Sequence, residues 1–114
     1  MKPKRTMIKI LAPLSNLKDT EPLIKAGANE FYCGLFSNRL QRKYQLFNLN
    51  ARPFSHSNFV SLNQLHKAVQ TAHTHTIPVY MTLNTSFYID KQMPFVINCI
   101  SKALKAGIDG FVVT

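Results

Sequence analysis

The two side chains in this sequence that could carry out nucleophilic chemistry together are a thiol and an imidazole, Cys33 and His56. A cysteine attacks a carbonyl carbon as the thiolate, and it needs a nearby base to lose its proton. His56 lies in the long polar stretch that follows Cys33, so the pair could form a nucleophile and its base. The alternative is that Cys33 is an inert buried thiol, which is the role that we also expect for Cys99.

Four other polar side chains are candidates for binding a substrate. Arg52 could hold a carboxylate or a phosphate through its planar guanidinium group, or it could be a solvated surface charge. Asn84 could offer its amide to a substrate, or it could fold back on its own loop as an Asx turn. Asn58 could instead fix the loop that enters a helix, and Asn16 could cap a helix.

The four histidines do not have the spacing of a metal site. His73 and His75 are two residues apart at a helix end and therefore point to different faces. His66 and His73 are two helical turns apart, which is about 10 Å and too far to share one ion. The sequence has no HExxH, CxxC or phosphate-loop motif, so we predict that these residues bind no metal.

The charge of the chain is strongly unbalanced, with 14 Lys and Arg against 5 Asp and Glu, a net charge of +9. Such an excess attracts polyanions such as nucleic acid. Residues 36–60 hold Arg39, Arg42, Lys43 and Arg52 and no acidic residue. This stretch is either a solvated surface or an anion-binding loop.

The cysteine count and the lengths of the hydrophobic runs bear on where in the cell the protein is found. Two cysteines are too few for the disulfide framework of a secreted domain. Lys9 interrupts the only apolar run near the start, so no signal peptide is expected, and no run is long enough to cross a membrane. We expect a cytoplasmic protein with reduced thiols and no membrane partner.

Apolar runs and turn signals alternate along the chain. Helix starts are expected at Asn16 with Asp19, at Ser61 with Gln64 as a capping box, and at Asp90. Helix ends are expected at Gly27 and Gly107. The expected strands are residues 7–13, 30–34, 77–84 and 110–114, and residues 35–60 are expected to form a long irregular loop.

Strands that alternate with helices predict parallel pairing with right-handed crossovers. Residues 25–31 (KAGANEF) and 105–111 (KAGIDGF) repeat the same helix end, glycine stop and strand start. Repeated βα units are typical of a (β/α)₈ TIM barrel, which needs about 250 residues. The rival, a doubly wound sheet, usually has a glycine-rich loop after its first strand, and residues 12–16 are not one. We predict a TIM-barrel-like α/β fold truncated to about three and a half βα units.

Six short motifs follow one another along the chain: ILAP (10–13), NL (16–17), KAGANEFYCG (25–34), NF (58–59), VYMTLN (79–84) and AGIDGFVV (106–113). This ordered set resembles the start of the collagenase-like peptidase U-32 family. Departures from the family pattern are Ser15 in place of glycine, Asn29 in place of aspartate, and a divergent stretch at 36–57. The resemblance implies a basic leader at 1–6 followed, at 7–114, by the N-terminal part of a barrel.

The resemblance also implies a function, namely a hydrolase of peptides that is inactive without the rest of the barrel. Some relatives are instead iron–sulfur proteins needed to hydroxylate RNA bases or a quinone precursor. Their cluster cysteines lie later than this chain reaches, so no cofactor is expected here. A third alternative is a decayed gene remnant without function. The partners to expect are therefore a peptide or an RNA.

A truncated barrel would leave the inner face of its strands uncovered, and we expect poor solubility and self-association through that face. We place Ile10, Tyr32, Met81 and Val112, or their neighbours, on it.

The basic stretch gives a testable prediction. If residues 36–60 meet phosphate, replacing Arg39, Arg42 and Arg52 with Gln will flatten the salt dependence of single-stranded RNA binding, by roughly 2 in the slope of log K against log[salt]. Fluorescence anisotropy with a labelled RNA over a salt series measures this slope. The absence of detectable affinity at low salt would contradict the anion-binding interpretation.

Overall fold

Four parallel strands form a single sheet in the order β1–β2–β3–β4 in the computed structural model, which describes residues 8–35, 58–83, 90 and 93–113. The strands are β1 (Leu11–Pro13), β2 (Glu30–Cys33), β3 (Val79–Leu83) and β4 (Gly110–Val113). Parallel pairing and sequential order are therefore confirmed. The sheet is not closed, so the barrel itself stays a prediction.

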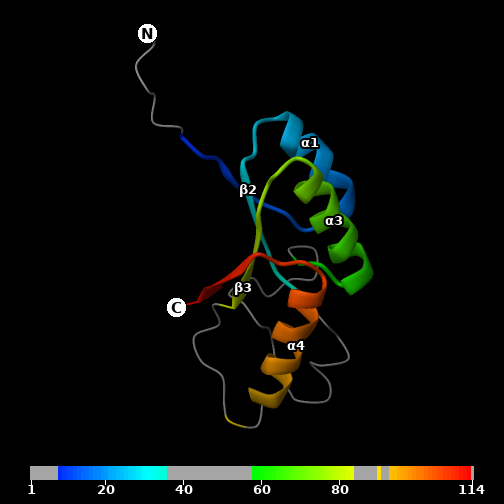
Figure 1. Ribbon diagram of the computed structural model, residues 1–114, viewed down its shortest axis with the longest axis vertical. Coiled ribbons are helices and arrows are strands. Elements are labelled where there is room, and N and C mark those ends of the chain that lie inside the picture. The colour runs from blue at the N-terminus through cyan, green and yellow to red at the C-terminus, as the bar shows by residue number, and fades with distance from the viewer. Residues whose placement is uncertain (1–7, 36–57, 84–89, 91–92, 114) are drawn as a thin grey trace.

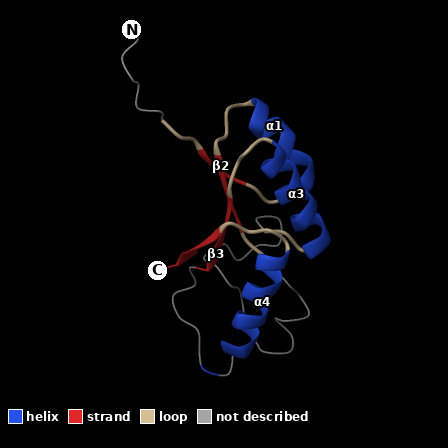
Figure 2. Cartoon of the chain, in the orientation of Figure 1, coloured by secondary structure: helices blue, strands red, loops and turns tan. Residues whose placement is uncertain are grey.

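The helices all lie on one side of this sheet (Figure 1, Figure 2). A short 3₁₀ helix, η1 (Leu17–Asp19), leads into α1 (Thr20–Lys25), which packs against α3 (Leu62–Thr74). The last helix is α4 (Met93–Lys105). Each helix links two parallel neighbours, which is the expected βαβ connection.

The core lies between the sheet and the helices. Alternate strand residues point toward the helices and are buried, among them Phe31 and Cys33 of β2 and Met81 of β3. Leu65, Ala68, Val69 and Ala72 of α3 recur at helical spacing on the facing side and are also buried. Burial contributes roughly 25 cal/mol per Å² of apolar surface, so this interface supplies most of the stability.

The opposite face of the sheet carries the other strand residues, and no described element covers it (Figure 1). Tyr32 and Val112 lie on it, as expected. They pair in register with Tyr80 and Thr82, the two neighbours of Met81, and side chains alternate between the two faces along a strand. The prediction for Met81 was wrong, since its side chain is completely buried in the core. Ile10 was also misplaced: its Cδ1 lies 3.7 Å from the position of a Cβ on Gly27, at the helix side.

The predicted helix starts are reproduced where they can be observed. The Asn16 side chain accepts a hydrogen bond from the Asp19 backbone N–H at 3.0 Å. Ser61 Oγ accepts one from the Gln64 N–H at 3.3 Å, as in a capping box. The cap at Asp90 stays a prediction, because α4 begins at Met93 and residues 91–92 lie outside the described part.

The three α-helices in the described part of the chain end in the same hydrogen-bonded turn. In α1, the Gly27 N–H donates to Ile24 and the Ala28 N–H donates to Leu23, which is the Schellman pattern. The same two bonds close α4 at Gly107 and Ile108, and α3 at Thr76 and Ile77. The residue in the turn has positive φ each time: 111° at Gly27, 100° at Gly107 and 59° at Thr76.

Just before β2 and just before β4, one residue binds the backbone of the neighbouring strand through both its side chain and its N–H. The Asn29 Oδ1 accepts the Ile10 N–H at 2.9 Å, while the Asn29 N–H donates to the Ile10 carbonyl. Asp109 makes the same pair of bonds with Val79. The repeat at 25–31 and 105–111 is therefore a repeated structural unit, in which the carboxylate or amide fixes the register of a new strand on its neighbour.

Thr76 gives a prediction about stability, because a β-branched residue is strained at a positive φ. The left-handed conformation costs roughly 1–2 kcal/mol in a non-glycine residue, and glycine recovers part of this. We expect Thr76→Gly to raise the free energy of unfolding by about 0.5–1 kcal/mol. Thermal denaturation followed by circular dichroism measures it.

The matched control is Thr74→Gly, two residues earlier at the last residue of α3. It should be destabilising, because glycine is a poor helix former and the Thr74 hydroxyl donates to the Thr71 carbonyl at 2.7 Å. Equal effects of the two substitutions would show that the turn is not strained.

Candidate functional site at the carboxyl edge of the sheet

Parallel strands place their carboxyl ends along one edge, and in α/β folds this edge carries the active groups. The strands end at Pro13, Cys33, Leu83 and Val113. The segments that follow β1 and β2 therefore lie at the same edge. Of the predicted site residues, Asn16, Cys33 and Asn58 are described there.

Asn16 lies just after β1 and is partly buried. Besides its capping bond, its Nδ2 donates to the Asp19 Oδ2 at 2.8 Å. Both ends of the amide are thus engaged with Asp19, so the described role of Asn16 is to start η1. Substrate binding by Asn16 stays a prediction.

The segment after β2 returns to the same edge. The Phe59 N–H donates to the Gly34 carbonyl at 2.8 Å, and Leu35 and Phe59 form a parallel bridge. The two ends of residues 36–57 are thereby held together. Asn58, next to this bridge, is only 2% exposed. Such burial favours the structural alternative for Asn58 over direct contact with a substrate.

Cys33 lies on the helix-covered face and has no exposed surface. The Thr82 hydroxyl, which the sequence analysis did not single out, donates to the Cys33 carbonyl at 3.1 Å and ties the ends of β2 and β3 together. A nucleophile must reach its substrate, so this location favours the inert alternative. The nucleophilic role stays a prediction.

The remaining candidates fall outside the described residues. These are His56, Arg52 and Asn84, and the basic residues Arg39, Arg42 and Lys43. Their roles stay predictions, and the pairing of Cys33 with His56 is not tested.

Two histidines have hydrogen-bond partners away from the carboxyl edge of the sheet. His73 Nε2 lies 2.8 Å from the Asp109 Oδ2, which also accepts the Val79 N–H, and His66 Nδ1 donates to the Ala106 carbonyl at 3.1 Å. His66 and His73 therefore contact different groups. Within the described ranges, no cluster of three or more His, Cys, Asp or Glu side chains could hold a metal ion.

The iron–sulfur alternative requires cysteine ligands for a cluster. Protein iron–sulfur clusters are usually held by four cysteine thiolates. This chain has two cysteines, and both are buried. It does not supply a complete ligand set by itself.

Burial shifts the pKa of the Cys99 thiol. It raises the pKa of Cys99 from 9.0 to about 11, and the nearby Lys102 offsets only part of that effect. At pH 8 about one Cys99 in a thousand would be a thiolate. Cys99 is therefore a core residue, as expected from its helical spacing.

The sheet, its one-sided helical layer and the edge just described define a parallel α/β protein. A family model, Peptidase family U32, matches residues 15–114. The chain therefore belongs to peptidase family U32. Comparison with curated proteins and with solved structures gives no match. No helix in the described part of the chain combines the length and the apolarity needed to cross a membrane.

The burial of Cys33 and Cys99 predicts slow chemical modification. We expect both thiols to resist iodoacetamide at pH 8 in the native protein and to react rapidly in denaturant, because the reagent must reach a thiolate. Mass spectrometry of timed samples counts the labelled sites. Rapid native labelling of Cys33 alone would instead support an activated nucleophile.

Proposed function

We propose that this chain forms one wall of a (β/α) barrel in a cytoplasmic U32 peptidase, with residues 1–6 as a basic leader and 7–114 as the first part of the barrel. Its carboxyl edge would contact a peptide substrate, and hydrolysis would need strands beyond these four. The observation that carries the proposal is the parallel four-stranded sheet whose described helices all lie on one face.

The geometry fits a part of a barrel wall better than a complete catalytic site. In barrels of this type, the interior is filled by side chains from all eight strands, and catalytic residues come from the ends of several of them. Here the thiol at the end of β2 is buried, and the two described asparagines are engaged or buried. The proposed peptide contacts are therefore Arg52 and Asn84, with Asn16 and Asn58 in supporting positions.

The proposal is tested first by digestion. Purified chain should release no more peptide from casein or gelatin than its Cys33→Ala variant, because the catalytic residues of such barrels come from the ends of several strands around the ring. Fluorescence release from labelled substrate measures this. Cleavage by the unmodified chain that the Cys33→Ala variant lacks would show that these four strands are catalytically sufficient.

Peptide binding tests the positive part of the proposal. Gelatin-derived peptides should bind the chain, and Arg52→Gln should weaken binding about tenfold or more, because charge-assisted hydrogen bonds contribute roughly 1.5–3 kcal/mol. Lys67→Gln is the matched control, since Lys67 is an exposed cation on the helical layer. Equal loss in both variants, or no binding at all, would contradict a peptide-binding edge.

A second candidate is a role in RNA modification, which the net charge of +9 favours. It differs from the first in its ligand. RNA that competes with gelatin peptides, and binds more tightly at low salt, would favour this alternative.

A further inference from the structure

A groove lies on the helical layer between α3 and α4. The start of α3 lies beside the end of α4 (Figure 1), and the His66 Nδ1 donates to the Ala106 carbonyl across the gap at 3.1 Å. Next to this hydrogen bond the two helices leave an open hollow of about 350 Å³. Its lining consists of three basic side chains, one amide and two apolar side chains: His66, Lys102, Lys105, Asn63, Leu62 and Ala106.

The basic side chains of this groove come from both helices. Lys102 and Lys105 are three residues apart in the last turn of α4, so they project from the same side of that helix. His66 projects from α3, and its Nδ1 must carry the proton because a carbonyl oxygen can only accept. The Nε2 of the ring is therefore the nitrogen that can meet a ligand. Two ammonium groups and one imidazole nitrogen line one small volume.

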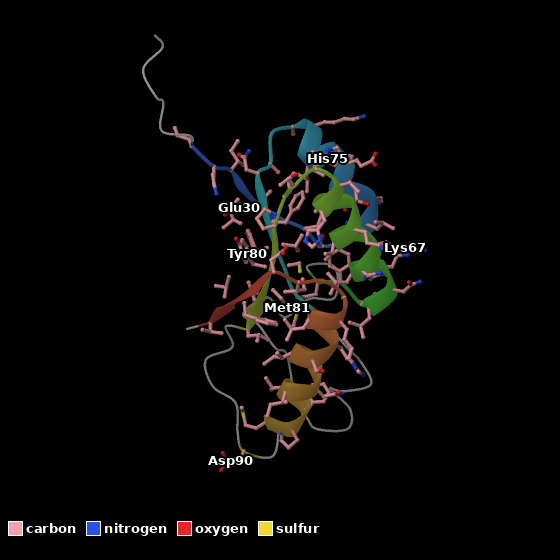
Figure 3. The ribbon with its side chains drawn as sticks, in the orientation of Figure 1. Glu30, Lys67, His75, Tyr80, Met81 and Asp90 are labelled. Atoms are coloured by element: carbon pink, nitrogen blue, oxygen red, sulfur yellow. The ribbon has the colours of Figure 1, made fainter. Side chains whose placement is uncertain are left out.

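No carboxylate neutralises these cations. The chain has five acidic residues, and the structure describes all five. None of them lines the groove, and three are bonded to groups in other parts of the fold, namely Asp19, Glu30 and Asp109. Asp90 lies ahead of α4, at the end of that helix far from Lys102 and Lys105 (Figure 3). The groove therefore keeps a positive charge that an anionic ligand can neutralise.

A second hollow on the helical layer provides a comparison. It lies between α1 and α3, and two lysines line it as well, Lys18 and Lys25. Glu21 lines the same hollow, so a carboxylate is already present to balance the lysines. Of these two hollows, the one between α3 and α4 is thus the one whose lining favours an anion.

The lining favours a phosphate monoester over a carboxylate. A phosphate monoester carries a charge of about −1.5 to −2 at neutral pH, which matches two lysines, whereas a carboxylate carries a single charge. Lysine binds phosphate as a point charge, while the planar fork that recognises carboxylates belongs to arginine. Leu62 and Ala106 add apolar surface beside the cations, and the volume is typical of a site for a small organic molecule.

We propose that the groove between α3 and α4 binds a small phosphate monoester. The phosphate would lie between the ammonium groups of Lys102 and Lys105 and would hydrogen-bond the Nε2 of His66. The organic group of the ligand would rest on Leu62 and Ala106. This site lies on the helical layer and not at the carboxyl edge, so it is independent of the proposed function.

Isothermal titration with phenyl phosphate tests the ligand class, at about 0.15 M salt so that distant charges are screened. Phenyl phosphate should bind more tightly than inorganic phosphate, which has no apolar group, and than benzoate, which has one charge. Lys102→Gln and Lys105→Gln should each raise the dissociation constant roughly fivefold or more, because each removes a charge-assisted hydrogen bond. The matched controls, Lys18→Gln and Lys25→Gln in the second hollow, should bind phenyl phosphate like the unmodified chain.

Three results of this titration would overturn the proposal. These are the absence of saturable binding, an equal loss of affinity in all four variants, and benzoate that binds as tightly as phenyl phosphate. The second result would mean that the net charge alone attracts the ligand. Circular dichroism of each variant confirms that it is folded.

Protection from acetylation locates the ligand without any substitution. Saturating phenyl phosphate should slow the acetylation of Lys102 and Lys105 by an N-hydroxysuccinimide ester and leave Lys18 and Lys25 unaffected. Peptide mass spectrometry measures the rate at each lysine. Unchanged rates at Lys102 and Lys105 would overturn the site. An RNA oligonucleotide without terminal phosphates carries only diesters and should not displace phenyl phosphate; displacement would show a surface for polyanions and would overturn the small ligand.

Discussion

One-sided burial is the constraint on which this structure depends. Side chains alternate between the two faces of a strand, so one register places Phe31, Cys33 and Met81 against the helices and places Tyr32 and Tyr80 on the other face. A slip of one residue in any strand would exchange these two sets and would expose the core. Correct registration of short parallel strands is therefore the main structural requirement.

The helix ends and the strand starts meet this requirement together. A Schellman turn reverses the chain after α1, α3 and α4, and the next residues enter a strand within two or three positions. Asn29 and Asp109 then bind the backbone of the preceding strand. β3 is the exception, because Pro78 occupies the corresponding position and its ring offers no acceptor. There, the Pro78 carbonyl accepts the Phe31 N–H at 3.0 Å, so the backbone alone sets the register.

The sequence predicted the order of elements, the parallel pairing and most helix boundaries, because capping residues and glycines act locally. It failed on the facing of β3. Residues 77–83 are nearly all apolar, so the run has no alternation from which to choose between Tyr80 and Met81. For Cys33 the sequence left two alternatives open, and the burial of its side chain favours the inert thiol. Arg52, His56 and Asn84 lie outside the described residues, so the roles predicted for them stay predictions.

The bridge between Leu35 and Phe59 has a consequence for the evolution of this fold. It pairs Leu35 with Phe59 as in a parallel sheet, so the residues close to either end of the 22-residue stretch 36–57 are held together. Doubling the length of a flexible loop adds only about 0.6 kcal/mol of closure entropy. Insertions and deletions in this segment can therefore accumulate with little effect on the sheet. Lineages that keep the same scaffold are free to change what is presented at its carboxyl edge.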